Sequence, residues 1–228
     1  KMFVINSPGN PSGSVYTLKE LQALGEVLRM HPNIIIATDD MYEHILWAEG
    51  GFHNIVSVCP ELYDRTVVMN GVSKAYSMTG WRIGYVAGPE ELVKAMKKIQ
   101  SQSITCVNAI AQVAAATALN ADRSHFDYML AAFKERHDVV HHALNAMQGV
   151  NCLKSDGTFY LLPDVSAVIQ RLGMKSDIEL ATHLLNKAHV ATVPGTAFGS
   201  PGHIRISIAT SLEKLNEAMA RIAPICDE

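Results

Sequence analysis

The sequence has few of the features that mark metal-binding, membrane or nucleic-acid-binding proteins. Its four cysteines, Cys59, Cys106, Cys152 and Cys226, show no Cys-x-x-Cys spacing, which favours reduced thiols in a cytoplasmic protein. No apolar run is long enough to span a bilayer, and no signal peptide opens the chain. The formal net charge is −3 without basic clusters, which argues against nucleic acid as the main partner. The absences predict a soluble, cytoplasmic protein that binds neither membrane nor nucleic acid.

The histidines do not form a metal site by their spacing either. His137 and His141 are four residues apart, and His142 adjoins the second of them. A metal would need a further ligand, and the sequence offers none at a suitable spacing. We therefore expect these histidines to lie on a solvated helix face, and we predict no bound metal.

The start of the chain carries no initiator methionine. Its first residues, Lys1 to Ile5, have the pattern of a core strand with no helix or cap before it. This pattern predicts that upstream sequence is missing and that the chain is the C-terminal part of a longer protein.

Hydrophobic residues make up 48% of the chain. They form short continuous runs in some segments and recur at helical spacing in others. In the first half, strands are predicted at 2–5, 34–37, 66–69 and 81–87, with a helix from the capping box Thr17–Glu20 to about His31. Further helices are expected from Pro89 to Ile99 and from Asn108 to Leu119. This order predicts an α/β domain with a parallel-type sheet.

The second half has a different pattern of predicted helices and strands. A long amphipathic helix at 124–147 precedes short strands near 152, 159–162, 190–193 and 204–208, and helices begin at the capping box Ser176–Glu179 and after Ser211. We predict two domains, a large-domain part at 1–134 that includes the start of a bridging helix and a small α+β domain at 135–228.

The stretch from Thr66 to Gly88 places a lysine directly after a buried strand. In one interpretation Lys74 forms a Schiff base with an aldehyde cofactor whose phosphate Ser73 and Arg82 hold, since the arginine fork matches phosphate geometry. In a second, Lys74 belongs to a nucleotide loop, although GxxxxGK[ST] is absent here. In a third, Lys74 is a solvated loop residue and Arg82 makes a structural ion pair.

Other polar residues follow predicted strand ends in the same way. Asn10, Asp39, Tyr42 and Lys74 all lie just beyond such ends. Ligands of parallel sheets bind beyond the carboxyl ends of the strands. We therefore expect these four residues to converge on one crevice.

Four motifs in order across the chain resemble those of the class I/II aminotransferases, the aspartate-aminotransferase-like enzymes that use pyridoxal 5'-phosphate (PLP). They are NSPGNPSG at 6–13, which is similar to N-P-x-N-P-T-G with Ser7 and Ser12 as departures, the D-x-x-Y at 39–42, the S-K-x-x-x-x-x-G-x-R at 73–82, and HIRISIATS at 203–211. The resemblance implies a fold type I PLP-dependent transferase with a truncated large domain and a complete small domain.

The resemblance also implies roles on the cofactor side. The residue matching Lys74 binds PLP as a Schiff base and moves the substrate α-proton, and the one matching Asp39 pairs with the pyridine N–H. Tyr42 and Asn10 would donate to the phenolate oxygen of PLP. Ser73 and Arg82 would hold its phosphate, where Gly71 replaces a hydroxyl residue that relatives often carry.

On the substrate side, the resemblance assigns the α-carboxylate to Arg205, together with Asn10. The segments PGTAF at 194–198 and GTFY at 157–160 are similar to family segments, and we interpret them as packing first. The run at 70–89 and SQS at 101–103 look most like bacterial enzymes of the gamma subgroup. Aspartate is therefore the favoured amino acid, a 2-oxo acid its partner substrate, and a homodimer the expected state of the full-length parent.

Sequence that precedes these motifs in the family would complete the large-domain sheet and the phosphate site, so the activity of this chain alone stays open. Two alternatives remain beside the aminotransferase. One is the aminotransferase-like PLP-binding sensor domain of a transcription regulator, and the other is a noncatalytic fragment without cofactor.

Overall fold

The computed structural model describes residues 1–228, which divide into two compact units. The first consists of residues 1–9 and 14–127, and the second of residues 10–13 and 128–228. The division at 127/128 falls at the start of helix α5 (Asp127–Asn145), and the border predicted at 134/135 lies within the same helix. The assignment of residues 10–13 to the second unit was not expected from the sequence.

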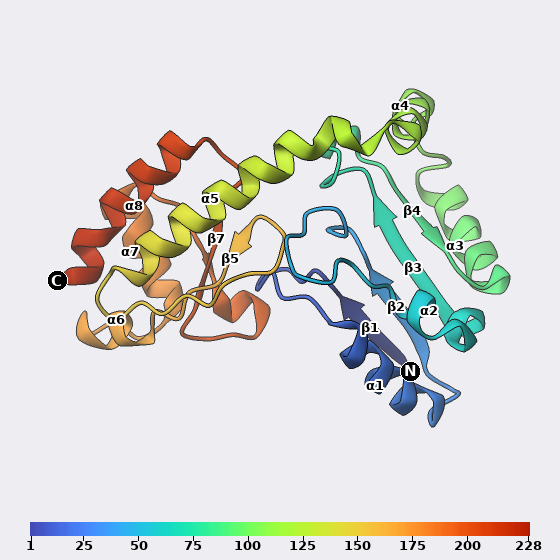
Figure 1. The fold of residues 1–228 in the computed structure, drawn as a ribbon, viewed down its shortest axis with the longest axis horizontal. Helices are drawn as coiled ribbons and strands as arrows, with labels where there is room; N and C mark the ends of the chain where they lie inside the picture. The colour runs from blue at the N-terminus through green and yellow to red at the C-terminus, as the bar shows by residue number, and fades with distance from the viewer. The chain divides into compact units, whose positions relative to one another are not determined.

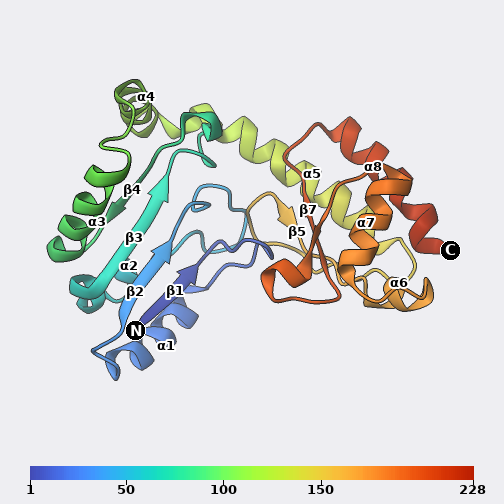
Figure 2. The same ribbon diagram turned by 180° about the vertical axis from the view of Figure 1, so that it is seen from behind.

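The first unit contains a four-stranded sheet and the helices around it (Figures 1 and 2). Its strands and helices in chain order are β1 (Met2–Asn6), α1 (Leu18–Arg29), β2 (Ile35–Asp39), α2 (Ile55–Val58), the 3-10 helix η1 (Pro60–Arg65), β3 (Thr66–Gly71), the 3-10 helix η2 (Thr79–Trp81), β4 (Gly84–Ala87), α3 (Glu90–Ser103), α4 (Ala109–Asn120) and the 3-10 helix η3 (Arg123–Phe126).

The sheet has the order β1-β2-β3-β4. The first three strands are parallel, as predicted, whereas β4 runs antiparallel to β3. The connection between β3 and β4 contains no crossover helix, and without such a connection the chain returns in the opposite direction. The sheet is therefore mixed.

The core of this unit lies between the sheet and the helices α1 and α2. The buried cluster consists of Ile5, Leu21, Leu28, Ile36, Ile55, Cys59 and Leu62. The predicted capping box opens α1, because the Thr17 hydroxyl accepts from Glu20 N at 3.3 Å and Glu20 Oε2 accepts from Thr17 N at 2.8 Å. Burial of leucine and isoleucine side chains stabilises such a cluster by roughly 1.5–3 kcal/mol each.

Two boundaries in this unit differ from the prediction. The strand expected at 81–87 begins only at Gly84, because η2 and the left-handed backbone of Arg82 (φ 52°) precede it. Helix α3 continues to Ser103 rather than ending near Ile99. The next helix begins where predicted, since Asn108 Oδ1 accepts from Ala111 N at 3.0 Å and caps α4.

The second unit is an α+β structure, as predicted. Its strands and helices are α5 (Asp127–Asn145), β5 (Tyr160–Leu161), α6 (Ser166–Arg171), α7 (Asp177–Ala188), β6 (Val193–Pro194), the 3-10 helix η4 (Gly195–Phe198), β7 (Ile204–Ser207) and α8 (Leu212–Asp227). The three strands form an antiparallel sheet of order β5-β7-β6. The strand expected near Cys152 is only an isolated bridge between Asn151 and Asp164.

The core of the second unit is built from residues of its four α-helices, of β5 and β7, and from Ile208, which follows β7. Its fully buried side chains include Val140, Leu144, Leu161, Val168, Leu180, Leu184, Ile204, Ile208 and Ile222. None of the chain's helices has the length and apolar character required to cross a bilayer.

Candidate functional site

In the first unit, the predicted cofactor residues follow the carboxyl ends of the parallel strands. Asn6, Asp39 and Met69 are register partners across β1, β2 and β3, and the Asn6 amide donates to Asp39 O at 3.4 Å. Since the three strands end at one edge of the sheet, the groups that follow them leave from the same edge. The structure therefore places Asp39, Tyr42 and the segment that carries Lys74 beyond this edge.

The turn after β2 orders Asp39 and Tyr42. Asp39 is half-buried, and its Oδ1 accepts from Met41 N at 3.2 Å. Tyr42 is buried, with 5% of its surface exposed. The Asp39 carboxylate is thus fixed by its own turn, which is a common role for aspartate after a strand.

Asp40 is a functional candidate that the sequence reasoning missed. It is buried, its Oδ1 accepts from the Thr38 hydroxyl at 2.6 Å, and its Oδ2 accepts from the Asn54 amide. Burial raises the pKa of the Asp40 carboxyl to about 6, although both hydrogen bonds favour the charged form. The side chain of Asp40 therefore ties the turn that carries Asp39 and Tyr42 to α2, which Asn54 caps. The only signal in the sequence was the doubled aspartate at 39–40.

The raised pKa of Asp40 predicts a specific dependence of stability on pH. Between about pH 4 and pH 6 the folded chain binds a proton at Asp40 that the unfolded chain has released, since the ordinary value is 3.8. As the pH rises from about 4 to about 6, the free energy of unfolding should therefore fall by about 3 kcal/mol relative to that of Asp40→Asn, which has no titrating group at this position. Urea unfolding of both proteins from pH 4 to pH 7 measures this difference. A difference independent of pH would contradict the assignment.

Lys74 lies in the turn after β3, between buried anchors. Ser73 and Lys74 are half-buried, and Val72, Ala75 and Tyr76 form a buried cluster with Ala115 of α4. The backbone on both sides of Lys74 is therefore held by packing.

Gly71, where relatives often carry a hydroxyl residue, has little room for a side chain. A Cβ at this position would lie 3.1 Å from Gly84 Cα and 3.1 Å from Ile83 O. Contacts this short are tighter than most native packing, so a Cβ at position 71 would require the backbone at 83–84 to shift by a few tenths of an ångström.

Arg82 is exposed and directly follows η2. Its Nη1 donates to Thr79 O at 2.8 Å, and its left-handed backbone turns the chain into β4. The sequence predicted Arg82 at the start of a strand, whereas the structure places it in the turn before that strand. An exposed guanidinium in a turn beside the Lys74 segment is suited to an anion.

In the second unit, Arg205 projects from β7 between two aromatic rings. Its guanidinium carbon lies 4.3 Å from the centre of the Tyr160 ring and 4.8 Å from that of Phe198. Its Nη1 donates to Asn10 Oδ1 at 2.8 Å, and its buried Nε has no hydrogen-bond partner. Tyr160 and Phe198 belong to the segments interpreted from sequence as packing, and the structure shows that they also hold Arg205.

Asn10 reaches Arg205 because residues 10–13 pack in the second unit. Gly13 O accepts from Asp156 N at 3.0 Å and from Gly157 N at 3.1 Å. Gly13 has a φ of 71°, and a Cβ there would lie 2.5 Å from Gly157 O, so only glycine suits this position. Of the two roles predicted for Asn10, the structure places it beside the predicted substrate-binding arginine.

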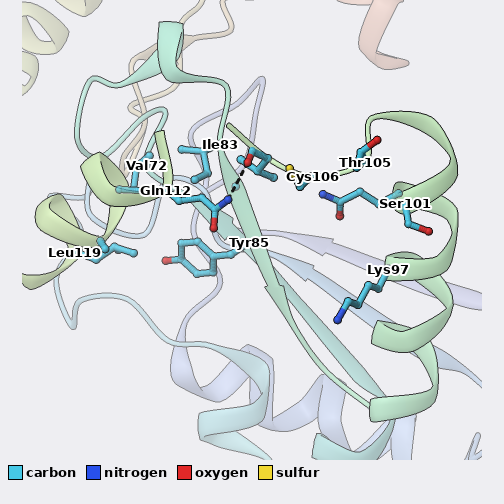
Figure 3. A pocket seen from close by; sticks show the side chains of 14 residues that line it. Val72, Ile83, Tyr85, Lys97, Ser101, Thr105, Cys106, Gln112 and Leu119 are labelled. Atoms are coloured by element: carbon cyan, nitrogen blue, oxygen red, sulfur yellow. Dashed lines mark hydrogen bonds between the residues drawn. The ribbon is translucent and has the colours of Figure 1, made fainter. Parts of the chain in front are cut away.

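A cavity of about 550 Å³ lies elsewhere in the first unit, between β4, α3 and α4 (Figure 3). It is lined by Tyr85, Lys97, Gln112 and mainly apolar neighbours, and the Gln112 amide donates to Val107 O at 2.8 Å. None of the predicted site residues lines it. The cavity is therefore separate from the residues predicted to form the site.

The histidines on α5 correct one expectation. His137, predicted on a solvated face, has no exposed surface. Its Nε2 accepts from Ser155 N at 3.1 Å, and its Nδ1 lies 3.0 Å from Asp138 Oδ1. The helical spacing was interpreted without the loop that covers this face of α5. No cluster of three or more histidine, cysteine, aspartate or glutamate residues is arranged to hold a metal ion.

The four sequence motifs resemble one enzyme family, and the comparison with known families agrees with them. The chain belongs to the aminotransferase class I and II family, whose model matches residues 1–222.

Among individual relatives, the chain is 56% identical to the aspartate/prephenate aminotransferase of Nitrosomonas europaea, over 99% of the chain and 58% of that protein. It is 43% identical to an aspartate aminotransferase of Rhizobium meliloti, over 98% of the chain and 56% of that protein.

Solved structures agree. The crystal structure of the aspartate aminotransferase from Rhizobium meliloti has a TM-score of 0.94 at 43% identity, covering 99% of this chain and 58% of that one. The aspartate aminotransferase from Thermotoga maritima has a TM-score of 0.88 at 39% identity, covering 100% and 57%. The chain thus has the fold of these enzymes and spans somewhat more than half of their length.

Proposed function

We propose that the protein to which this chain belongs is a PLP-dependent aminotransferase that moves an amino group between an amino acid and a 2-oxo acid. The observation that carries the proposal is the placement of Lys74, Asp39 and Tyr42 beyond one edge of the sheet in a chain of this family. A solvated loop lysine without a ligand would not require Asp39 and Tyr42 at the same edge of the sheet.

The residues at this edge fit PLP in their chemistry. The Asp39 carboxylate suits the protonated ring nitrogen, and the buried Tyr42 hydroxyl suits the phenolate oxygen. The exposed Arg82 guanidinium and the Ser73 hydroxyl suit the phosphate. We infer that these four residues, with Lys74, hold the cofactor.

When bound at the Lys74 amine, PLP supplies the electron sink that makes the substrate α-proton acidic. The Lys74 amine would hold the cofactor aldehyde, and the same amine, when free, would carry the substrate α-proton as a general base and acid. The Asp39 carboxylate would pair with the ring nitrogen and so favour the protonated ring.

Arg205 would bind the substrate α-carboxylate. Its buried Nε lacks a partner, and a carboxylate that bridges two guanidinium nitrogens would satisfy it. Tyr160 and Phe198 would fix the plane of the guanidinium, so the carboxylate binds in one orientation. Asn10 supports the other side of the same guanidinium.

For substrates we propose aspartate as the amino donor and prephenate among the 2-oxo acid acceptors. Relatives 56% and 47% identical to the chain are named aspartate/prephenate aminotransferases. The relatives described here are aminotransferases, and they lend no support to the regulator alternative. A homodimeric, cytoplasmic parent protein remains part of the proposal.

The test begins with cofactor binding by this chain. PLP is added, and borohydride reduces the C=N bond between the cofactor and the lysine amine to a stable secondary amine. The labelled peptide is then mapped. We expect the label on Lys74, with Lys97 as the internal comparison because it lies in the cavity outside the proposed site. Label spread over many lysines would contradict a specific cofactor site in this chain. The full-length protein is then assayed with aspartate and with prephenate as the acceptor.

A further inference from the structure

The loop between α5 and β5 joins the parts of the second unit that surround Arg205. Ser155 is buried, with 3% of its surface exposed, and its hydroxyl donates to Tyr160 O at 3.0 Å. Tyr160 N donates to the Thr158 hydroxyl at 3.1 Å. The backbone of Tyr160, whose ring lies against Arg205, is thus held by the loop from both sides.

The same loop holds the segment that carries Asn10. Asp156 N and Gly157 N both donate to Gly13 O, and a Cβ on Gly13 would lie 2.6 Å from Ser155 Cβ. A displacement of Ser155 would therefore reach Arg205 by two routes, through the Tyr160 ring and through the Asn10 side chain.

One buried side chain fixes Ser155 from the helix side. His137 Nε2 accepts the Ser155 N–H at 3.1 Å, and this is possible only when Nε2 carries no proton. The Asp138 carboxylate, 3.0 Å from Nδ1, stabilises the tautomer with the proton on Nδ1. Burial lowers the pKa of His137, which keeps the imidazole neutral at the pH of a cell.

From these contacts we propose that His137 is a positioning residue for the carboxylate site: its Nε2 holds Ser155, and through the loop 155–160 it orients Tyr160, Asn10 and hence Arg205. The inference rests on the proposed function, because it assumes that Arg205 binds the substrate carboxylate. His137 itself contacts neither substrate nor cofactor in this assignment.

The length of the side chain at position 137 provides a matched pair of variants. In His137→Gln the amide oxygen stands as many bonds from Cα as Nε2 does, so it can accept the Ser155 N–H. In His137→Asn the amide reaches only the position of Nδ1, so the Ser155 N–H loses its acceptor. Both replacements are neutral and polar, and they differ mainly in this hydrogen bond.

The experiment measures binding of maleate, an unreactive dicarboxylate, to the full-length protein loaded with PLP, by calorimetry. We expect His137→Asn to weaken maleate binding about 10-fold and His137→Gln to stay within about threefold of the parent. The KM for aspartate should follow maleate affinity while kcat changes little, and amide exchange at 155–160 should be faster only in the Asn variant.

Gly13→Ala provides an independent route to the same loop, should His137→Asn fold poorly. We expect it to weaken maleate binding about 10-fold as well, with PLP affinity unchanged. Parent-like maleate binding by Gly13→Ala or by His137→Asn overturns the inference. Equal losses in His137→Asn and His137→Gln also overturn it, because they would indicate a merely structural role.

Arg205→Met separates this inference from the proposed function. If Arg205→Met binds maleate as the parent does, Arg205 is not the carboxylate site and the proposed function is wrong at that point. If Arg205→Met loses maleate and the His137 pair shows no difference, only the role of His137 is overturned.

Discussion

Lys74→Ala in the full-length protein is expected to reduce transamination by about 10⁴-fold or more. The variant would lose both the amine that binds the cofactor aldehyde and the group that carries the α-proton, and acid–base catalysis alone contributes about 10²–10⁴-fold. Turnover is measured with aspartate as donor, and bound cofactor is followed by its visible absorbance.

The fold should survive this change. The turn that carries the half-buried Lys74 is held by Val72, Ala75 and Tyr76, so the free energy of unfolding should fall by only about 1 kcal/mol. Lys94→Ala is the matched control, because Lys94 is exposed on α3 and pairs with Glu90 at 2.7 Å. Parent-like turnover by Lys74→Ala, or an equal loss in Lys94→Ala, would contradict the role of Lys74.

The elements of the fold that sequence predicted well are those with strong local signals. The capping box before α1, the N-cap Ser176 of α7 and the apolar run of β2 identify their elements without knowledge of the rest of the chain. The boundaries that differed depend on context. Arg82 adopts a left-handed backbone that no local propensity favours, and the end of α3 lacks a proline or glycine to stop the helix.

For the site, motif order predicted which residues bind cofactor and substrate, but it carried no information on the residues that support them. Asp40, His137 and Ser155 act on their neighbours through side chain and backbone contacts between residues far apart in sequence, such as the 18 positions between His137 and Ser155. Hydrophobic periodicity carries no information on such pairs, because a buried histidine and a solvated one occupy the same helical spacing. The pairing of Asn10 with Arg205 was beyond sequence reasoning for the same reason.

The second large effect is expected at Arg205. The Arg205→Met variant keeps an apolar stem that can pack between Tyr160 and Phe198 and removes the charge that the substrate carboxylate would meet. Loss of one partner from a buried, charge-assisted pair costs about 3 kcal/mol, which corresponds to about 100-fold in affinity. We therefore expect the KM for aspartate to rise about 100-fold, while the affinity for PLP changes less than about threefold.

Two further variants serve as comparisons: Arg205→Lys keeps the charge at the site, and Arg221→Met removes an arginine outside it. Lysine keeps the charge but cannot form a bidentate pair, so Arg205→Lys should lie between the parent and Arg205→Met. Arg221 is exposed on α8 and forms an ion pair with Glu217, four residues earlier. Its replacement should leave the affinities for PLP and for aspartate unchanged. If Arg205→Met weakened PLP and aspartate equally, Arg205 would belong to the cofactor site. The different changes in affinity for PLP and for aspartate thus decide whether Arg205, held between Tyr160 and Phe198, binds the substrate.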